Sequence, residues 1–338
     1  MLEIELCQPD GRTPSLGAIP FICPLCGRIP RLSSTQIEEF SKYLEQMKRV
    51  WQADIENYLH SFPTKKPLPT LNCRFYLPTC TADKIREDDL IDFLVDSVVR
   101  YVTESKLLDP ERMKDPAYSS RIYRRARDKF RQKDPKPSEV GELILFILLE
   151  SEGIIQVVQK MPLKTNKNMP LHGADGIHVQ VDNGMILLHF GESKMYKDLG
   201  GAISKSIDSV TDFTNGDGGK RKFELDIIST YIDKEKFGRY ADVLAEIVLP
   251  YAKNKQKYRE VNSIFIGYNW DVMCKLSSRD QLDLTAFLKS EFEKRHDEIA
   301  EKMQKAVLGS KIKDQHFHVQ FMPFVDVDQF KAKFKKEL

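Results

Sequence analysis

The sequence lacks any marked excess of charge, because 52 Lys and Arg residues are balanced by 50 Asp and Glu residues. It also lacks a long hydrophobic run, since the longest apolar stretch, residues 143–149, is far too short to cross a bilayer. The N-terminus shows no basic and apolar leader, so we expect a cytoplasmic protein with no membrane segment. Bulk charge neither supports nor excludes nucleic acid as a partner, and that question depends on local patches.

Cysteine is scarce, with six residues in a chain of 338, so we expect free thiols rather than a disulfide framework. Cys23 and Cys26 stand in the sequence Cys-Pro-Leu-Cys-Gly, which is half of a zinc knuckle. A structural Zn²⁺ site needs four ligands, and the other nearby candidates are Cys7, Cys73 and Cys80. Two interpretations stay open: a Zn²⁺ site, or a pair of free loop cysteines.

The hydrophobic spacing predicts an α/β (α+β) fold with an α-rich N-terminal region. Hydrophobic residues make up 41% of the chain and charged residues 30%, which is typical of a globular protein. Residues 62–80 concentrate Pro and Cys, and we expect them to be irregular. The order of elements indicates a mixed sheet flanked by helices. Expected helices span 34–60, 82–104, 139–151, 202–213 and 282–307, and expected strands span 177–181, 185–190, 261–268 and 316–321.

The expected helix at 139–151 is apolar on nearly every side. Pro135 and Pro137 break the preceding chain, and Ser138 can cap a helix that begins at Glu139. A helix without a polar face belongs inside a fold, so we expect this one to pack on the sheet.

Asn183 and Gly184 form the strongest hairpin signal, a two-residue type I′ turn between strands. If they are the loop, the residues on one face pair as apolar partners, which supports that register. His178 and His189 then face each other on the opposite side, where packing or surface pairing explains them. The apolar pairs are Ile177 with Phe190, Val179 with Leu188, and Val181 with Ile186.

Counted outward from this turn, Asp175 falls opposite Glu192, and Lys194 lies two residues further on the same face. Two neighbouring carboxylates repel each other and lose hydration unless a cation neutralises them. Mg²⁺, or Mn²⁺, prefers such oxygen ligands, and a lysine beside it can stabilise charge on a phosphodiester. The residues therefore indicate a catalytic metal site for phosphodiester hydrolysis. The simpler interpretation is a surface salt bridge at a strand end.

This arrangement resembles the PD-(D/E)XK nuclease superfamily, with Asp175 and Glu192-Ser193-Lys194 in the motif and Ala174 in place of its proline. The resemblance implies a restriction-endonuclease-like core. Many members also carry a Glu on the preceding helix. Glu142 matches that position as a further catalytic and metal-binding residue, with Glu139 one turn earlier as the fallback.

Residues 172–178, 187–196, 201–207 and 318–330 are similar to the HamA family, the nuclease subunits of the Hachiman anti-phage defence system. The similarity covers about residues 80–338. It implies DNA as target and a HamB-like ATP-dependent helicase as partner. We therefore expect an accessory segment at 1–80 and a HamA-like region at 81–338, with the nuclease core at about 137–270 and a C-terminal helix and strand at 271–338. The alternative function is a catalytically inactive subunit that binds DNA or a partner.

A basic run begins at Arg121 and continues through Arg124, Arg125 and Arg127 to residue 136. DNA phosphates would favour such a patch. A solvated helix face, or a contact with an acidic partner protein, explains it equally simply.

Overall fold

A computed structural model describes residues 32–63, 69–81, 84–131, 139–158, 175–215, 225, 229–248, 258–275 and 284–338. The zinc prediction at Cys23 and Cys26 lies outside these ranges, and so does the basic run beyond residue 131. No helix within the described ranges is long and apolar enough to cross a membrane.

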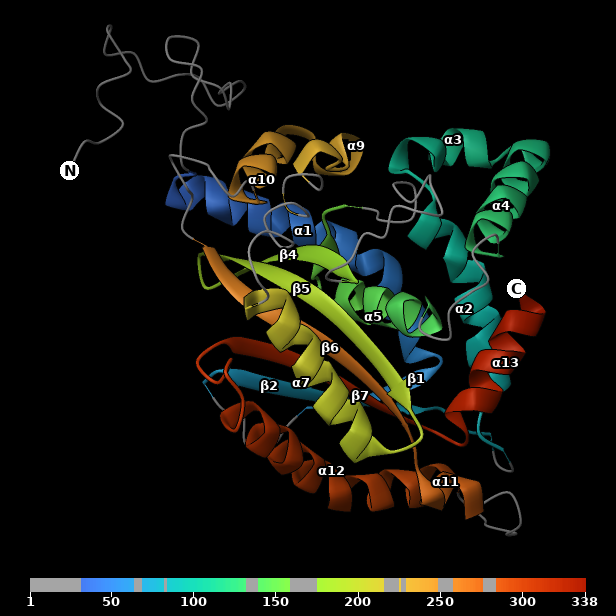
Figure 1. Ribbon diagram of the computed structural model, residues 1–338. Helices are drawn as coiled ribbons and strands as arrows, with labels where there is room; N and C mark the ends of the chain where they lie inside the picture. The colour runs from blue at the N-terminus through green and yellow to red at the C-terminus, as the bar shows by residue number, and fades with distance from the viewer. Residues whose placement is uncertain are drawn as a thin grey trace, which may run out of the picture.

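A seven-stranded mixed sheet forms the centre of the protein, in the order β1-β2-β7-β6-β5-β4-β3 (Figure 1). The four strands β2, β7, β6 and β5 run parallel, whereas β1, β4 and β3 are antiparallel to their neighbours. The predicted mixed α/β architecture is therefore confirmed. The strands are β1 (Leu59–Pro63), β2 (Leu71–Pro78), β3 (Ile155–Gln156), β4 (Gly176–Asp182), β5 (Met185–Tyr196), β6 (Tyr258–Asn269) and β7 (His316–Phe324).

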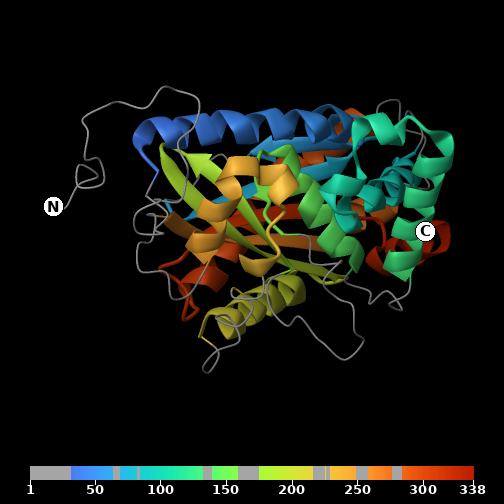
Figure 2. The same cartoon turned by 90° about the horizontal axis from the view of Figure 1, so that it is seen from above.

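Helices cover both faces of the sheet. The helices α7 and α12 share one hydrophobic cluster with β2, β6 and β7. On the other side, α5 packs with α2, α4 and α13, and the last three gather at one end of the molecule (Figures 1 and 2). The helices are α1 (Ser34–Glu56), α2 (Glu87–Val102), α3 (Pro110–Met113), α4 (Pro116–Arg131), α5 (Glu139–Ser151), α7 (Leu199–Asn215), α9 (Lys234–Phe237), α10 (Ala241–Val248), α11 (Asp271–Lys275), α12 (Leu284–Leu308) and α13 (Val327–Glu337), with 3₁₀ turns η2 (Ser105–Leu107) and η3 (Gly238–Tyr240).

The expectation that residues 62–80 are irregular was wrong, because β2 occupies most of that segment. Every second residue of β2, from Leu71 to Leu77, is buried in the cluster formed with α7 and α12. Its parallel partner is β7, more than 200 residues further along the chain. A strand that depends on so distant a partner leaves little local signal beside Pro and Cys residues.

The hairpin register predicted from the sequence is confirmed. Asn183 and Gly184 have φ angles of 48° and 74°, as a type I′ turn requires. The strand pairs run from Asp182 with Met185 to Gly176 with Gly191. His178 pairs with His189, and both are buried, so they are packing residues rather than a surface pair.

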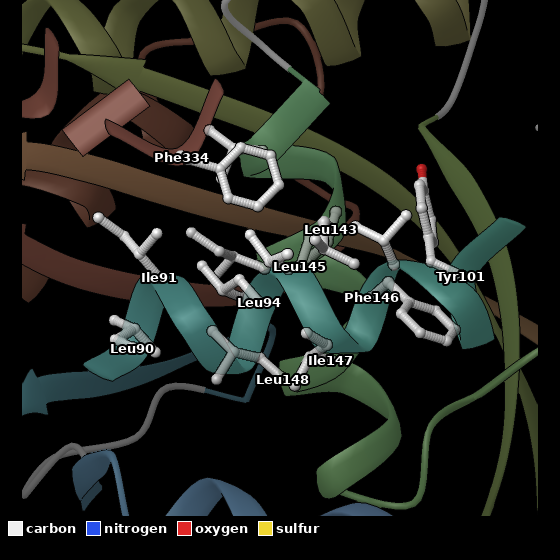
Figure 3. Packing of buried hydrophobic residues seen from close by; sticks show 14 of the residues in the cluster. Leu90, Ile91, Leu94, Tyr101, Leu143, Leu145, Phe146, Ile147, Leu148 and Phe334 are labelled. Carbon is white, nitrogen blue, oxygen red and sulfur yellow. The ribbon is translucent and has the colours of Figure 1, made fainter. Parts of the chain in front are cut away.

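The predicted apolar helix is α5, whose bounds match the expectation. Its leucines and Phe146 pack against α2 and the sheet (Figure 3). Gly141 allows the first turns of α5 to lie close to β5, since a Cβ there would meet Ser193 Oγ and Met195 Cγ at 3.3 Å. This close approach brings the first turn of α5, with Glu139 and Glu142, beside the C-terminal end of β5.

Candidate active site

Glu192 and Lys194 lie on the face of β5 that α7 covers. The register pairs them with Ile264 and Ile266 of β6, which belong to the hydrophobic cluster with α7 and α12. Glu192 is 9% exposed, and Lys194 Nζ forms an ion pair with Glu192 Oε1. The side chain of Ser209, on α7, also hydrogen bonds to the Glu192 carboxylate. The predicted proximity of this glutamate and lysine is thus present.

Asp175 is placed differently from the expectation of a direct cross-strand pair. The ladder between β4 and β5 ends at Gly176 and Gly191, and the Asp175 N–H donates to the Gly191 carbonyl at 2.7 Å. Asp175 Oδ2 then accepts hydrogen bonds from Ser193 N at 2.7 Å and Ser193 Oγ at 2.9 Å. Because the regular ladder has ended, Asp175 reaches Ser193 of β5 instead of facing Glu192 across the two strands.

The charges of these groups still act on one another. Burial, followed by the negative charge of Asp175, raises the pKa of Glu192 to about 7, although Lys194 acts in the opposite direction. Burial alone would lower the pKa of Lys194, but the charge and hydrogen bond of Glu192, together with Asp175, raise it above the ordinary value. The site therefore holds a carboxylate that is costly to ionise beside a firmly protonated lysine.

Tyr101, on α2, connects the α5 side to this site. The sequence pattern did not predict it as a site residue. Its hydroxyl donates to Glu142 Oε2 at 3.3 Å. Burial, and then the charges of Glu142, Asp175 and Glu139, hold the pKa of Tyr101 well above its ordinary range. The charge of Asp175 thus acts both on Tyr101 and on Glu192. A tyrosine on the buried face of an amphipathic helix gives no sequence signal that separates it from ordinary core.

The carboxylates of Asp175 and Glu192 are ligands of the kind that a hard divalent cation prefers. Within the described ranges, no three His, Cys, Asp or Glu side chains are grouped closely enough to hold a metal ion. Asp175 and Glu192 provide two carboxylates, and Mg²⁺ is commonly held by one or two carboxylates with water and substrate phosphate completing its shell. The raised pKa of Glu192 also indicates a site where a cation would relieve like-charge repulsion. Glu142 as a further ligand stays a prediction.

The predicted nucleic-acid residues lie on α4 and not among the site residues above. Arg121, Arg124 and Arg125 are exposed, whereas Arg127 is partly buried with Nη2 3.8 Å from Asp96 Oδ1. The surface they form is therefore separate from the Asp175 and Glu192 cluster.

Fold and site together define a mixed α/β protein whose sheet carries a carboxylate and lysine cluster at the point where one hairpin ladder ends. A model of the HamA family matches residues 54–338 of the chain, and the chain belongs to this family. Membership supports a role in Hachiman anti-phage defence. The match begins before β1, so it includes β1 and β2. No curated protein sequence matches the chain.

Proposed function

We propose that this protein is a divalent-metal-dependent nuclease of the PD-(D/E)XK type that hydrolyses phosphodiester bonds of DNA. The observation that carries the proposal is the buried Glu192, whose pKa is raised to about 7 beside Asp175 and whose carboxylate is paired with Lys194. Burying two carboxylates and an ammonium group together costs stability, and such arrangements are concentrated at functional sites. The HamA membership supports the same conclusion.

Each residue has a role in this proposal. Asp175 and Glu192 would hold Mg²⁺ or Mn²⁺, whereas Glu142, which is not grouped with them closely enough to share the ion here, would be a further ligand only if the first turn of α5 came closer. Bound there, the cation supplies activation of water and neutralisation of phosphate charge. Lys194 donates hydrogen bonds from its protonated ammonium group to the attacking water or to a phosphate oxygen, where negative charge develops. Ser193 fixes the Asp175 carboxylate through its two hydrogen bonds.

Incubation of plasmid DNA with the purified chain tests this function. We expect cutting in Mg²⁺, none in EDTA, and none by the Lys194→Ala variant in Mg²⁺. Because the proposed partner would restrain the nuclease, the same assay is run with the complex co-purified from cells, which should cut less DNA than the free chain. If neither preparation cuts DNA but both bind it, the alternative function, an inactive nuclease fold that binds DNA or a partner, is the correct one.

We further propose that the chain is the effector subunit of a complex with a separately encoded, HamB-like ATP-dependent helicase. A nuclease with no sequence-reading motif would be toxic if it were always active. Restraint requires that the helicase contact the resting and active states differently, because equal affinity for both shifts no equilibrium. Co-expression with a HamB-like helicase should yield a stable complex and lower toxicity. If the two proteins did not co-purify and toxicity were unchanged, the proposed helicase partnership would be refuted. The nuclease proposal would be unaffected.

A further inference from the structure

Helix α4 is amphipathic, with one narrow apolar stripe. Tyr118, Ile122, Ala126 and Phe130 recur every fourth residue and are all buried. They belong to the hydrophobic cluster that α2, α5 and α13 also form. This spacing places them on one side of the helix, so the remaining positions of α4 face outward.

The outward positions are strongly basic. Between residues 118 and 130 the chain carries five Arg or Lys residues and one acid, Asp128. Arg124, Arg125 and Lys129 are exposed and form no ion pair with any residue that the structure describes. Tyr123 lies among them and is 41% exposed. A row of exposed cations with an exposed aromatic ring is typical of a surface that binds nucleic acid.

The C-terminal end of α4 lies near the candidate active site. The Phe130 ring is 6.2 Å from the ring of Tyr101. The Tyr101 hydroxyl contacts Glu142 at 3.3 Å, and the Asp175 charge acts on the same hydroxyl. A hollow of about 330 Å³ between α4 and the residues after α2 has Arg125 and Lys129 in its wall. The buried face of α4 is therefore connected through Phe130 and Tyr101 to Glu142, while the cations lie on the opposite, exposed face of the same helix.

From this placement we propose that the outward face of α4 binds the phosphate backbone of the DNA duplex and directs it to the site at Asp175, Glu192 and Lys194. The inference rests on the proposed function for its substrate. Residues 121 to 129 span ~12 Å of helix. One strand of a duplex carries a charge about every 3.4 Å along the axis, so this face can contact roughly three phosphates. Arg127 lies near Asp96, so it should contribute less to phosphate binding than Lys129 does.

The test is the salt dependence of DNA binding in EDTA, where a metal-dependent enzyme does not cut. The variant Arg124→Gln/Arg125→Gln/Lys129→Gln is compared with wild type by fluorescence anisotropy on a short DNA duplex. Its matched control, Lys305→Gln/Lys311→Gln/Lys313→Gln, removes three exposed lysines from the end of α12 and the turn that follows it. Each lost phosphate contact lowers the slope of log affinity against log salt by ~0.9.

We expect the α4 variant to lose at least about tenfold in affinity near 0.1 M salt and roughly 2.7 units of slope, while the control stays close to wild type. Arg124→Lys/Arg125→Lys/Lys129→Arg, which keeps all three charges, should restore binding. An α4 variant that binds DNA like wild type overturns the inference, even if it fails to bind the helicase. Lys194→Ala separates the two proposals: retained binding without cutting is expected, whereas continued cutting by this variant would refute the active site and not the α4 surface.

Discussion

Ser193 holds the Asp175 carboxylate twice, through its backbone N–H at 2.7 Å and its hydroxyl at 2.9 Å, both to Oδ2. The middle residue of the Glu-x-Lys segment thus orients the aspartate at the end of the neighbouring strand. Oδ2 is engaged by the protein in this way, and under the proposed function Oδ1 is the oxygen that would face a metal or its water.

Ser193→Ala should lower cleavage and divalent-metal affinity by about 10- to 100-fold, because residues that orient a metal ligand have effects of this size. The backbone hydrogen bond stays, so the loss should be partial. Ser193→Thr keeps a hydroxyl and should recover most activity. Isothermal calorimetry with Mn²⁺ measures the affinity.

The control for this substitution is Ser206→Ala on α7, which removes another buried hydroxyl, one that donates to helix carbonyls of Ala202 and Ile203. Equal effects at the two positions would show that Ser193 matters only for folding. Metal affinity unchanged in Ser193→Ala would contradict its role in orienting Asp175.

Lys194→Ala should abolish cleavage, with at least a 100-fold loss of rate, while the fold stays intact. Its side chain is 22% exposed at the end of a strand, so its removal leaves no sealed core cavity. The melting temperature and the yield of helicase complex provide the readout of folding. A variant that cuts plasmid at the wild-type rate would remove this lysine from the mechanism.

Glu192→Gln should stabilise the metal-free protein above neutral pH. A folded pKa of about 7, against an ordinary value of 4.5, means that the proton-bound state is favoured in the folded protein. This stabilisation is complete below pH 4.5 and is lost as the pH rises through 7. The glutamine variant avoids that loss, so at pH 8 it should gain about 1 kcal/mol, or roughly 2 °C in melting temperature.

Melting curves in EDTA from pH 5 to pH 8 check this prediction. The difference between Glu192→Gln and wild type should be small at pH 5 and should grow with pH. A difference of constant size across this range would mean that Glu192 does not titrate there. Calorimetry should also show that the variant binds Mg²⁺ more weakly.

Tyr101→Phe should have a smaller effect than either active-site substitution, and Glu142→Ala a similar one. The phenol hydroxyl orients Glu142 but contacts neither Glu192 nor Lys194 in the described contacts. We expect a 3- to 10-fold fall in cleavage, which is the size of effect that follows from losing an orienting hydrogen bond of ~1 kcal/mol. The salt dependence of DNA binding should be unchanged. If Glu142→Ala abolished cleavage, Glu142 would be an essential ligand rather than an auxiliary one.

The part of the site predicted from sequence is the part encoded by local pattern. Asn183-Gly184 and the alternating apolar residues determine the hairpin register, and that register brings Glu192 and Lys194 to one face. The place of Asp175 could not be predicted in the same way. Its position depends on where the ladder stops and on a hydrogen bond to Ser193, and neither follows from alternation.

The elements missed from sequence depend on distant partners. The strand β2 is stable only against β7 on one side and β1 on the other. Tyr101 reaches the site because α2 packs on α5, two helices separated by η2, α3 and α4. Local periodicity predicts that such segments are buried, but it does not predict what they lie beside.

Glu152, just after α5, is the centre of a buried polar network, and none of its described contacts is with Asp175, Glu192 or Lys194. It accepts hydrogen bonds from the Tyr76 hydroxyl and from Gln320 Nε2, both at 2.6 Å. Arg74 Nε and His318 Nε2 lie 2.9 Å and 3.0 Å from Oε2. Burial alone would raise the pKa of Glu152, but His318, Arg74 and Tyr76 together lower it to about 2. The network joins β2 and β7 to the end of α5.

Glu152→Gln should destabilise the protein by about 3 kcal/mol at pH 7, because removing one charge from a buried network leaves its partners uncompensated. A carboxyl whose folded pKa is depressed contributes stability that is present above pH 4.5 and is lost as the pH falls through about 2. The difference between wild type and variant should therefore be full at pH 7 and should shrink between pH 4.5 and pH 2. Urea unfolding across that range measures it. A variant as stable as wild type at pH 7 would show that the network adds no net stability.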